Sequence, residues 1–266
     1  MGIIGYVRVI GLSLLSTFIF IALILYSDRK SREPLYMIFL SLVSCIFTIC
    51  LSLLLGQVLL PKLEIISSGL FDYRTCNILK IVLLASIEEY SKLVVLYLFI
   101  SKNSNFNDVY DGFVYSSLIA LSFAALESLI YVFSEPNIDN MTSLAILRGI
   151  TTVPLHLICG ISMGYFMGRE KFTWGTKARA KNLILCLLFP TFLHSIYNFT
   201  LANIIRRYLN SSFLTVAIVL FFLPFYVIGV IFIDKIKSLN KKFKNNEHYK
   251  NLMTNDEYNE IVNKHY

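Results

Sequence analysis

Residues 78–100 decide the fold, and they read ILKIVLLASIEEYSKLVVLYLFI. The stretch is long enough to cross a bilayer, because a membrane-spanning helix needs about 20 mostly apolar residues. Yet Glu88, Glu89 and Lys92 stand in its middle. A charge near the centre of a bilayer costs roughly 2.5–3.5 kcal/mol on insertion scales, so such side chains face protein or a water-filled cavity. The stretch therefore predicts a membrane helix whose polar face is turned toward other helices.

The rest of the chain has the composition of a membrane protein. Hydrophobic residues make up 56% of its 266 residues and charged residues only 15%, whereas soluble domains have about 45–50% and 25%. About seven segments are long and apolar enough to span a bilayer: 5–26, 35–60, 78–100, 110–133, 142–168, 182–203 and 212–234. We therefore expect an all-α, polytopic helix bundle over residues 1–234, followed by a polar tail over residues 235–266.

Lysine and arginine are unevenly distributed among the loops. With seven spans, the basic loops 27–34 and 169–181 fall on the same side of the membrane as the basic tail, and the opposite loops hold few basic residues. Because cytoplasmic loops are enriched in Lys and Arg, we expect a multi-pass cell-membrane protein with its N-terminus outside and its C-terminus cytoplasmic. This distribution accounts for the net charge of +7, so the charge does not indicate nucleic-acid binding, and the expected surroundings are the lipid bilayer.

Further polar residues stand in the later spans, namely Glu127, Arg148, His156, His194 and Asn198. Each would be costly if it faced lipid, so we expect these side chains to converge with the polar face of residues 78–100 inside the bundle. Helical spacing agrees, because residues three or four apart share a face of a helix. Glu88 and Glu89 are four and three residues from Lys92, and His194 is four from Asn198.

A cluster of this kind can perform hydrolysis. Two adjacent carboxylates at low dielectric do not both ionise easily, so Glu88 and Glu89 should titrate as a coupled pair and provide a general base for water. Lys92 and Arg148 can support this by keeping a carboxylate charged or by binding a developing oxyanion. The histidines and Asn198 can donate hydrogen bonds to a tetrahedral intermediate. Together these groups suit cleavage of an amide bond inside the membrane.

A metal ion is compatible with the same residues. Glu89, His156 and His194 match a catalytic zinc site, which has three protein ligands and one open position. The sequence has no H-E-x-x-H motif and no C-x-x-C pair, so zinc or another divalent metal is not required by the pattern. The residues alone therefore leave open whether the site uses a metal ion.

The order of these motifs resembles the PrsW family of intramembrane proteases. E-E-x-x-K ends at Lys92, F-A-x-x-E runs from Phe123 to Glu127, Arg148 precedes H-x-x-x-G at His156, and H-x-x-x-N begins at His194. The resemblance covers residues 78–200 within a protease domain of residues 1–234. Two positions depart from the family pattern. Ser128 stands where Asn is frequent, and Asn198 stands where many members have Asp. Asn at the second position resembles the related CAAX prenyl-protease and bacteriocin-processing proteins, whose last motif is also H-x-x-x-N, so a membrane protease of that type is the alternative that the resemblance leaves open.

The resemblance implies a substrate and two mechanisms. PrsW-like proteins make the first, extracytoplasmic-side cut in a membrane-anchored anti-sigma factor, which begins regulated intramembrane proteolysis. The resemblance thus implies an intramembrane endopeptidase whose water is activated by a glutamate, with or without a metal. Two other functions stay open from the residues alone. Intramembrane Glu, His and Lys also form relays in proton- or ion-coupled transporters, and the cluster could be the structural core of a non-catalytic scaffold.

Overall fold

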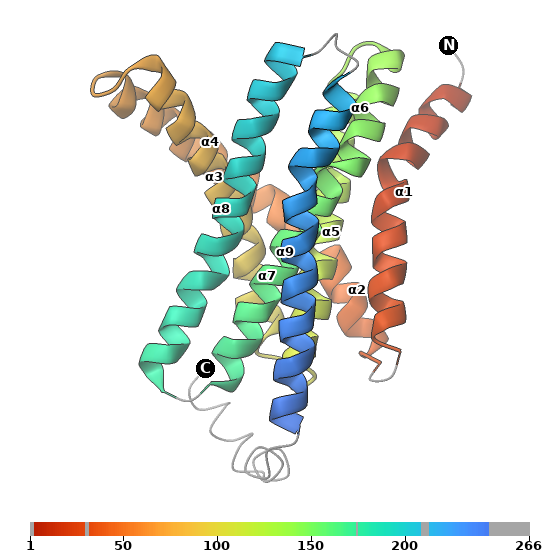
Figure 1. The fold of residues 1–266 in the computed structure, drawn as a ribbon, viewed down its shortest axis with the longest axis vertical. Coiled ribbons are helices and arrows are strands. Elements are labelled where there is room, and N and C mark those ends of the chain that lie inside the picture. Colours follow the sequence, from red (N-terminus) through yellow and green to blue (C-terminus); the bar gives the residue numbers. More distant parts are fainter. Residues whose placement is uncertain (1–2, 30–31, 174, 209–212, 245–266) are drawn as a thin grey trace.

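The computed structural model describes residues 3–29, 32–173, 175–208 and 213–244, and the side chains of all these except 202–208, 213–222, 243 and 244. Within these ranges the chain forms helices and no strands, so the all-α prediction is confirmed (Figure 1). The helices are α1 (Ile3–Ser27), α2 (Leu35–Val43), α3 (Cys45–Ser68), α4 (Tyr73–Val95), α5 (Val109–Phe133), α6 (Ile138–Ile150), α7 (Thr152–Phe172), α8 (Thr176–Tyr208) and α9 (Phe213–Lys244), with a π-helical turn η1 (Leu96–Ile100) continuing α4.

The number of spans is close to the predicted seven. Five helical segments of the described residues are long and apolar enough to cross a membrane: Ile3–Ser27, Leu35–Ser68, Val109–Phe133, Ile138–Phe172 and Thr176–Leu201. α4 lies at the predicted span 78–100 and packs mainly against α3 and α8, but its sequence carries five charged residues. The predicted span 212–234 corresponds to the first part of α9, much of whose side-chain structure lies outside the described residues.

Short polar side chains begin several helices. Asp72 accepts a hydrogen bond from the backbone N–H of Arg74 at the start of α4, and Asn137 caps α6 in the same way. At α5, Asp108 and Asp111 each accept a hydrogen bond from the other residue's backbone N–H, which forms a capping box. Such caps satisfy the first N–H groups of a helix, which have no partner within the helix.

The predicted span 142–168 is not a single helix. It is divided at Thr151, whose backbone torsions φ −120° and ψ −62° are not helical, into α6 and α7. Pro154 explains the break. It has no N–H to donate to the carbonyl of Ile150, and its ring would clash with that carbonyl in a continuous helix. In the first turn of a new helix the missing N–H has no cost, so α7 begins at Thr152.

The centre of the bundle is the contact between α5 and α7, which are buried along most of their length. Glycines on α7 allow the two backbones to approach closely, as the small-residue spacing of this segment predicts. A Cβ atom on Gly164 would lie 2.2 Å from the carbonyl oxygen of Gly112, and one on Gly160 would lie 2.7 Å from Cβ of Ala120. This packing holds the first turns of α7 at a fixed position beside α5.

The connections gather at the two ends of the bundle. Figure 1 shows the connections after α1, after η1 and between α7 and α8 at the end opposite the N-terminus, together with the C-terminal end of α9. The predicted polar tail begins within α9, which continues to Lys244. Residues 245–266 of that tail lie outside the described residues.

Candidate active site

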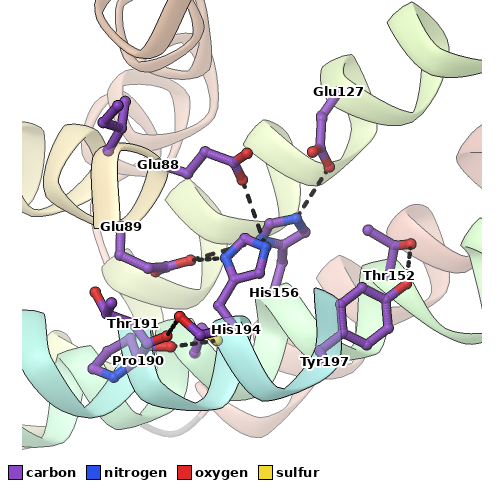
Figure 2. Close-up of polar contacts among 12 residues, drawn as sticks. Glu88, Glu89, Glu127, Thr152, His156, Pro190, Thr191, His194 and Tyr197 are labelled. Atoms are coloured by element: carbon purple, nitrogen blue, oxygen red, sulfur yellow. Dashed lines mark hydrogen bonds and ion pairs between the residues drawn. The ribbon is translucent and has the colours of Figure 1, made fainter. Parts of the chain in front are cut away.

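Four helices bring the predicted ionisable residues into one buried cluster (Figure 2). Its members come from α4 (Glu88, Glu89 and Lys92), α5 (Glu127), α7 (His156) and α8 (His194). All but Glu127 are at most 5% exposed. The two imidazole rings lie perpendicular to each other, with their centroids 4.9 Å apart. The convergence expected from the cost of placing charges in lipid is thus present in the structure.

Glu89 is the electrostatic centre of the cluster. Its Oε1 accepts a hydrogen bond from Lys92 Nζ at 2.7 Å and lies 2.9 Å from His194 Nδ1. Because the carboxylate is paired with an ammonium group, the hydrogen-bond network assigns the hydrogen to His194 Nδ1, which then donates it to Glu89. Nε2 of His194 therefore carries the free lone pair. Glu89 thus neutralises Lys92 and fixes the orientation of His194.

Lys92 also determines which ring nitrogen of His156 carries the hydrogen. Lys92 Nζ lies 2.8 Å from His156 Nδ1 and 4.3 Å from the centroid of the Phe123 ring. An ammonium group can only donate, so Nδ1 of His156 accepts and the hydrogen of a neutral imidazole is on Nε2. That nitrogen lies 3.1 Å from Oε2 of Glu127, to which it donates. Lys92 is therefore fully engaged inside the cluster.

Glu127 and Arg148 form the less buried side of the site. Arg148 donates from its terminal NH2 nitrogen (Nη2) to Glu127 Oε2 at 2.6 Å and from Nε to Ser128 Oγ at 3.2 Å. Its guanidinium carbon lies 4.4 Å from the centroid of the Tyr131 ring. The side chains of Glu127 and Arg148 are 13% and 11% exposed, whereas those of Glu89, Lys92 and His156 are at most 1% exposed. The Glu127–Arg148 ion pair is therefore more exposed than the Glu89, Lys92 and His156 side chains.

One carboxylate oxygen of Glu88 is buried but does not take part in the hydrogen bonds of the cluster. Its Oε2 has no hydrogen-bond partner among the described residues and lies 3.7 Å from His194 Nε2. One ligand atom each of Glu88, His156 and His194 lie within 4.8 Å of one another. The sequence predicted Glu89 as the carboxylate of this metal-binding set. The structure brings Glu88 together with the two histidines, while Glu89 faces Lys92 and Nδ1 of His194.

Asn198 is a predicted site residue that has no hydrogen bond to the buried cluster. It is half-buried on α8, one turn beyond His194, and it makes no hydrogen bond to another described side chain. Sequence reasoning missed Tyr197, whose hydroxyl contacts both Thr151 and Thr152 at the start of α7. It also treated Ser128 only as a departure from a family pattern, although this serine accepts from Arg148.

The fold and the site together define a class of protein. Buried carboxylates, two imidazoles and cations from four helices of an apolar, multi-span bundle are typical of a membrane-embedded acid–base site that can hydrolyse a bond. A family model described as PrsW family intramembrane metalloprotease matches residues 33–228. The chain therefore belongs to the PrsW family, and the cluster is the candidate active site of an intramembrane protease.

Similar proteins agree with this family. Protease PrsW of Clostridioides difficile is 30% identical over 175 residues, which cover 65% of this chain and 71% of that protein. Protease PrsW of Oceanobacillus iheyensis is 33% identical over 180 residues, covering 66% of this chain and 75% of its own length. Protease PrsW of Bacillus subtilis is 34% identical over 115 residues, covering 43% and 50%. No solved structure matches the chain. The relation to CAAX prenyl proteases stays a prediction.

Proposed function

We propose that this chain cleaves a membrane-anchored anti-sigma factor at the extracytoplasmic side of the membrane. The observation that carries the proposal is the convergence of Glu88, Glu127, His156 and His194 from four helices of a PrsW-family bundle. The side of the cut follows from the loops. The described residues of the basic loops 27–34 and 169–181 lie at one end of the bundle, which the positive-inside bias assigns to the cytoplasm. Glu127 lies toward the opposite end, in the last third of α5.

In this proposal Glu88 is the general base. Its buried Oε2, without a hydrogen-bond partner among the described side chains, faces Nε2 of His194 at 3.7 Å, and a water between them would give its proton to the carboxylate. The water oxygen then adds to the carbonyl carbon of the scissile peptide bond. Glu88 returns the proton to the amide nitrogen as the C–N bond breaks, which releases a carboxylic acid and an amine.

The negative charge that develops on the oxyanion must be stabilised by donors on the less buried side of the site. The Nε2–H group of His156 and the guanidinium of Arg148 both point at Glu127 Oε2, so a substrate carbonyl entering beside Glu127 would meet these two donors. Preorganised donors of this kind stabilise a tetrahedral intermediate most when water is excluded. Lys92 is committed to Glu89 and His156, and we assign it a structural role.

If the site holds a divalent metal such as zinc, Glu88, His156 and His194 would be its ligands, and Oε2 of Glu88 would then bind the ion in place of acting as the base. Their fit rests on the 4.8 Å grouping of ligand atoms and on the unpartnered Oε2 of Glu88. Glu89 accepts from Nδ1 of His194, which is the support that a metal-binding imidazole usually has. Nε2 of His156 donates to Glu127 here, so its use as a ligand requires loss of that hydrogen. A bound ion would supply a Lewis acid and a more acidic water.

Cleavage can be tested in proteoliposomes that contain the purified chain and a membrane-anchored anti-sigma factor. We expect the substrate to be shortened by a cut on the side opposite the basic loops, and His194→Ala to leave it intact. Glu64→Gln is the control, since Glu64 forms an exposed ion pair with Lys80, and neither residue contacts the buried cluster. A substrate that stays whole with the wild-type chain, or is cut equally by His194→Ala, would contradict the proposal.

Metal dependence has a separate readout. We expect equilibrium dialysis against Zn²⁺ to find about one tightly bound ion per wild-type chain, and weaker binding in Glu88→Gln and His194→Ala. A chelator should then stop cleavage, and added zinc should restore it. If wild type and both variants bind zinc equally weakly and the chelator leaves cleavage unchanged, the metal assignment is wrong, whereas the role of Glu88 as a base stands.

A further inference from the structure

We infer that Tyr197 is a positioning residue, which fixes the break between α6 and α7 and thereby aims Arg148 and His156 at Glu127; this inference rests on the proposed function. Tyr197 lies on α8, three residues after His194, and is 2% exposed. Figure 2 shows its ring extending from α8 toward Thr152, on the side of the cluster where Glu127 lies. One turn of α8 thus carries both a site histidine and a side chain that reaches the broken helix.

The hydroxyl of Tyr197 joins two threonines in a directed chain. It lies 3.1 Å from Thr151 Oγ1 and 2.7 Å from Thr152 Oγ1. Thr151 already donates its hydroxyl hydrogen to the carbonyl oxygen of Leu147 at 2.7 Å. Thr151 must therefore accept from Tyr197, and the Tyr197 oxygen accepts from Thr152. Both threonines are buried, so removal of the tyrosine hydroxyl would leave them without this partner at low dielectric.

These hydrogen bonds lie at the break between α6 and α7, where the hydrogen bonding of the helix backbone is interrupted. Thr151 is the residue between the two helices and Thr152 is the first residue of α7. Pro154 removes the hydrogen bond that a continuous helix would make to the carbonyl of Ile150. The angle between α6 and α7 therefore depends on side-chain contacts more than it would in an unbroken helix, and Tyr197 supplies one of these contacts from a third helix.

The break separates two residues that act on the same atom. Arg148 is one turn before Thr151 and His156 is one turn after Thr152, and they donate to the same Oε2 of Glu127 at 2.6 and 3.1 Å. A change in the angle at the break moves one donor relative to the other. A displacement of about 1 Å can lower a catalysed rate about 100-fold. The hydroxyl of Tyr197 is engaged with the two threonines, so its effect on the reaction is indirect.

The test compares Tyr197→Phe, Thr152→Val and the double variant in the proteoliposome assay. We expect each single variant to lower kcat about tenfold and to leave KM within about twofold. The double variant should be no slower than Tyr197→Phe alone, because the Thr152–Tyr197 hydrogen bond that Thr152→Val removes is already lost in Tyr197→Phe. Thr152→Ser, which keeps the hydroxyl, should restore kcat. The control is Tyr165→Phe, which removes a hydroxyl that bonds Arg169 at the other end of α7.

A second measurement does not depend on activity. We expect hydrogen exchange of backbone amides in residues 148–156 to be faster in Tyr197→Phe than in wild type, with the rest of α7 unchanged. Unchanged exchange at the break would overturn the inference, as would an unchanged kcat or a loss of kcat equal to that of Tyr165→Phe. If the wild-type chain cleaves nothing, the proposed function fails, and hydrogen exchange still decides whether Tyr197 fixes the break.

Discussion

Glu88→Gln is expected to slow cleavage by about three orders of magnitude and to leave the protein folded. Loss of a general base typically costs a factor of 10²–10⁴ in rate. Glutamine has nearly the same shape but cannot take a proton from water. The unfolding midpoint should change little, because Oε2 of Glu88 has no hydrogen-bond partner among the described residues, and an amide at this position could donate to Nε2 of His194. Initial cleavage rates in proteoliposomes and detergent unfolding of the same preparations measure the two effects.

Two comparisons make this result specific. Glu64→Gln also removes one carboxylate, but from an exposed ion pair, and should keep the wild-type rate. Glu89→Gln should lose both rate and stability, because Glu89 pairs with Lys92 and orients His194. If Glu88→Gln retains more than about a tenth of the wild-type rate, another group activates the water. The assignment of Glu88 as the general base, which rests on its unpartnered Oε2, is then wrong.

Lys92→Met is expected to cause the largest loss of stability. The Lys92–Glu89 ion pair is buried on both sides, at 1% and 0% exposure. Removing one partner of such a pair leaves an uncompensated charge and typically destabilises a protein by about 3–5 kcal/mol. The variant also removes the donor to Nδ1 of His156. Equilibrium unfolding in mixed micelles, followed by circular dichroism, measures the change in the free energy of unfolding.

The double variant Lys92→Met with Glu89→Gln separates charge from packing. We expect it to be more stable than Lys92→Met alone, because no uncompensated charge remains in the cluster. Lys80→Met is the matched control, since Lys80 pairs with Glu64 at 34% and 63% exposure, and an exposed pair contributes about 0–1 kcal/mol. Equal destabilisation by Lys92→Met and Lys80→Met would show that the buried pair does not hold the cluster together.

The convergence of the site was predictable because lipid penalises isolated charges strongly. Glu88, Glu127, His156 and His194 occur in four separate apolar segments, and inward orientation is the favourable arrangement for all of them. The same physical argument gives the helical fold, since backbone groups within a bilayer must be satisfied inside the segment. Apolar length and polar interruption in the sequence were therefore sufficient for the class of fold and for most of the site.

The division of roles between Glu88 and Glu89 was beyond the sequence pattern. Both are within one turn of Lys92, so helical spacing alone allows either to form the ion pair. In the structure Glu89, three residues from Lys92, forms the ion pair and also contacts His194 of α8, which packs against α4. The spacing of residues along one helix does not determine how that helix packs against another.

Neutral side chains that position the site gave no signal in the sequence. Tyr197 and Thr151 are ordinary residues of a membrane helix, and their importance appears only when α8 lies against the break between α6 and α7. The break itself depends on Pro154, which a membrane helix can also tolerate as a kink. A single span over residues 142–168 was thus a reasonable expectation that the structure corrects.

The most direct test of the central claim, that four helices supply one active site, is the cleavage rate of Glu127→Gln/His194→Ala compared with its two single variants. Residues that act as a unit are strongly non-additive. We predict that each single change lowers the rate at least about 100-fold and that the double variant is no slower than the slower single. Rates that fall by the product of the two single effects, or a single variant with the wild-type rate, would contradict the account.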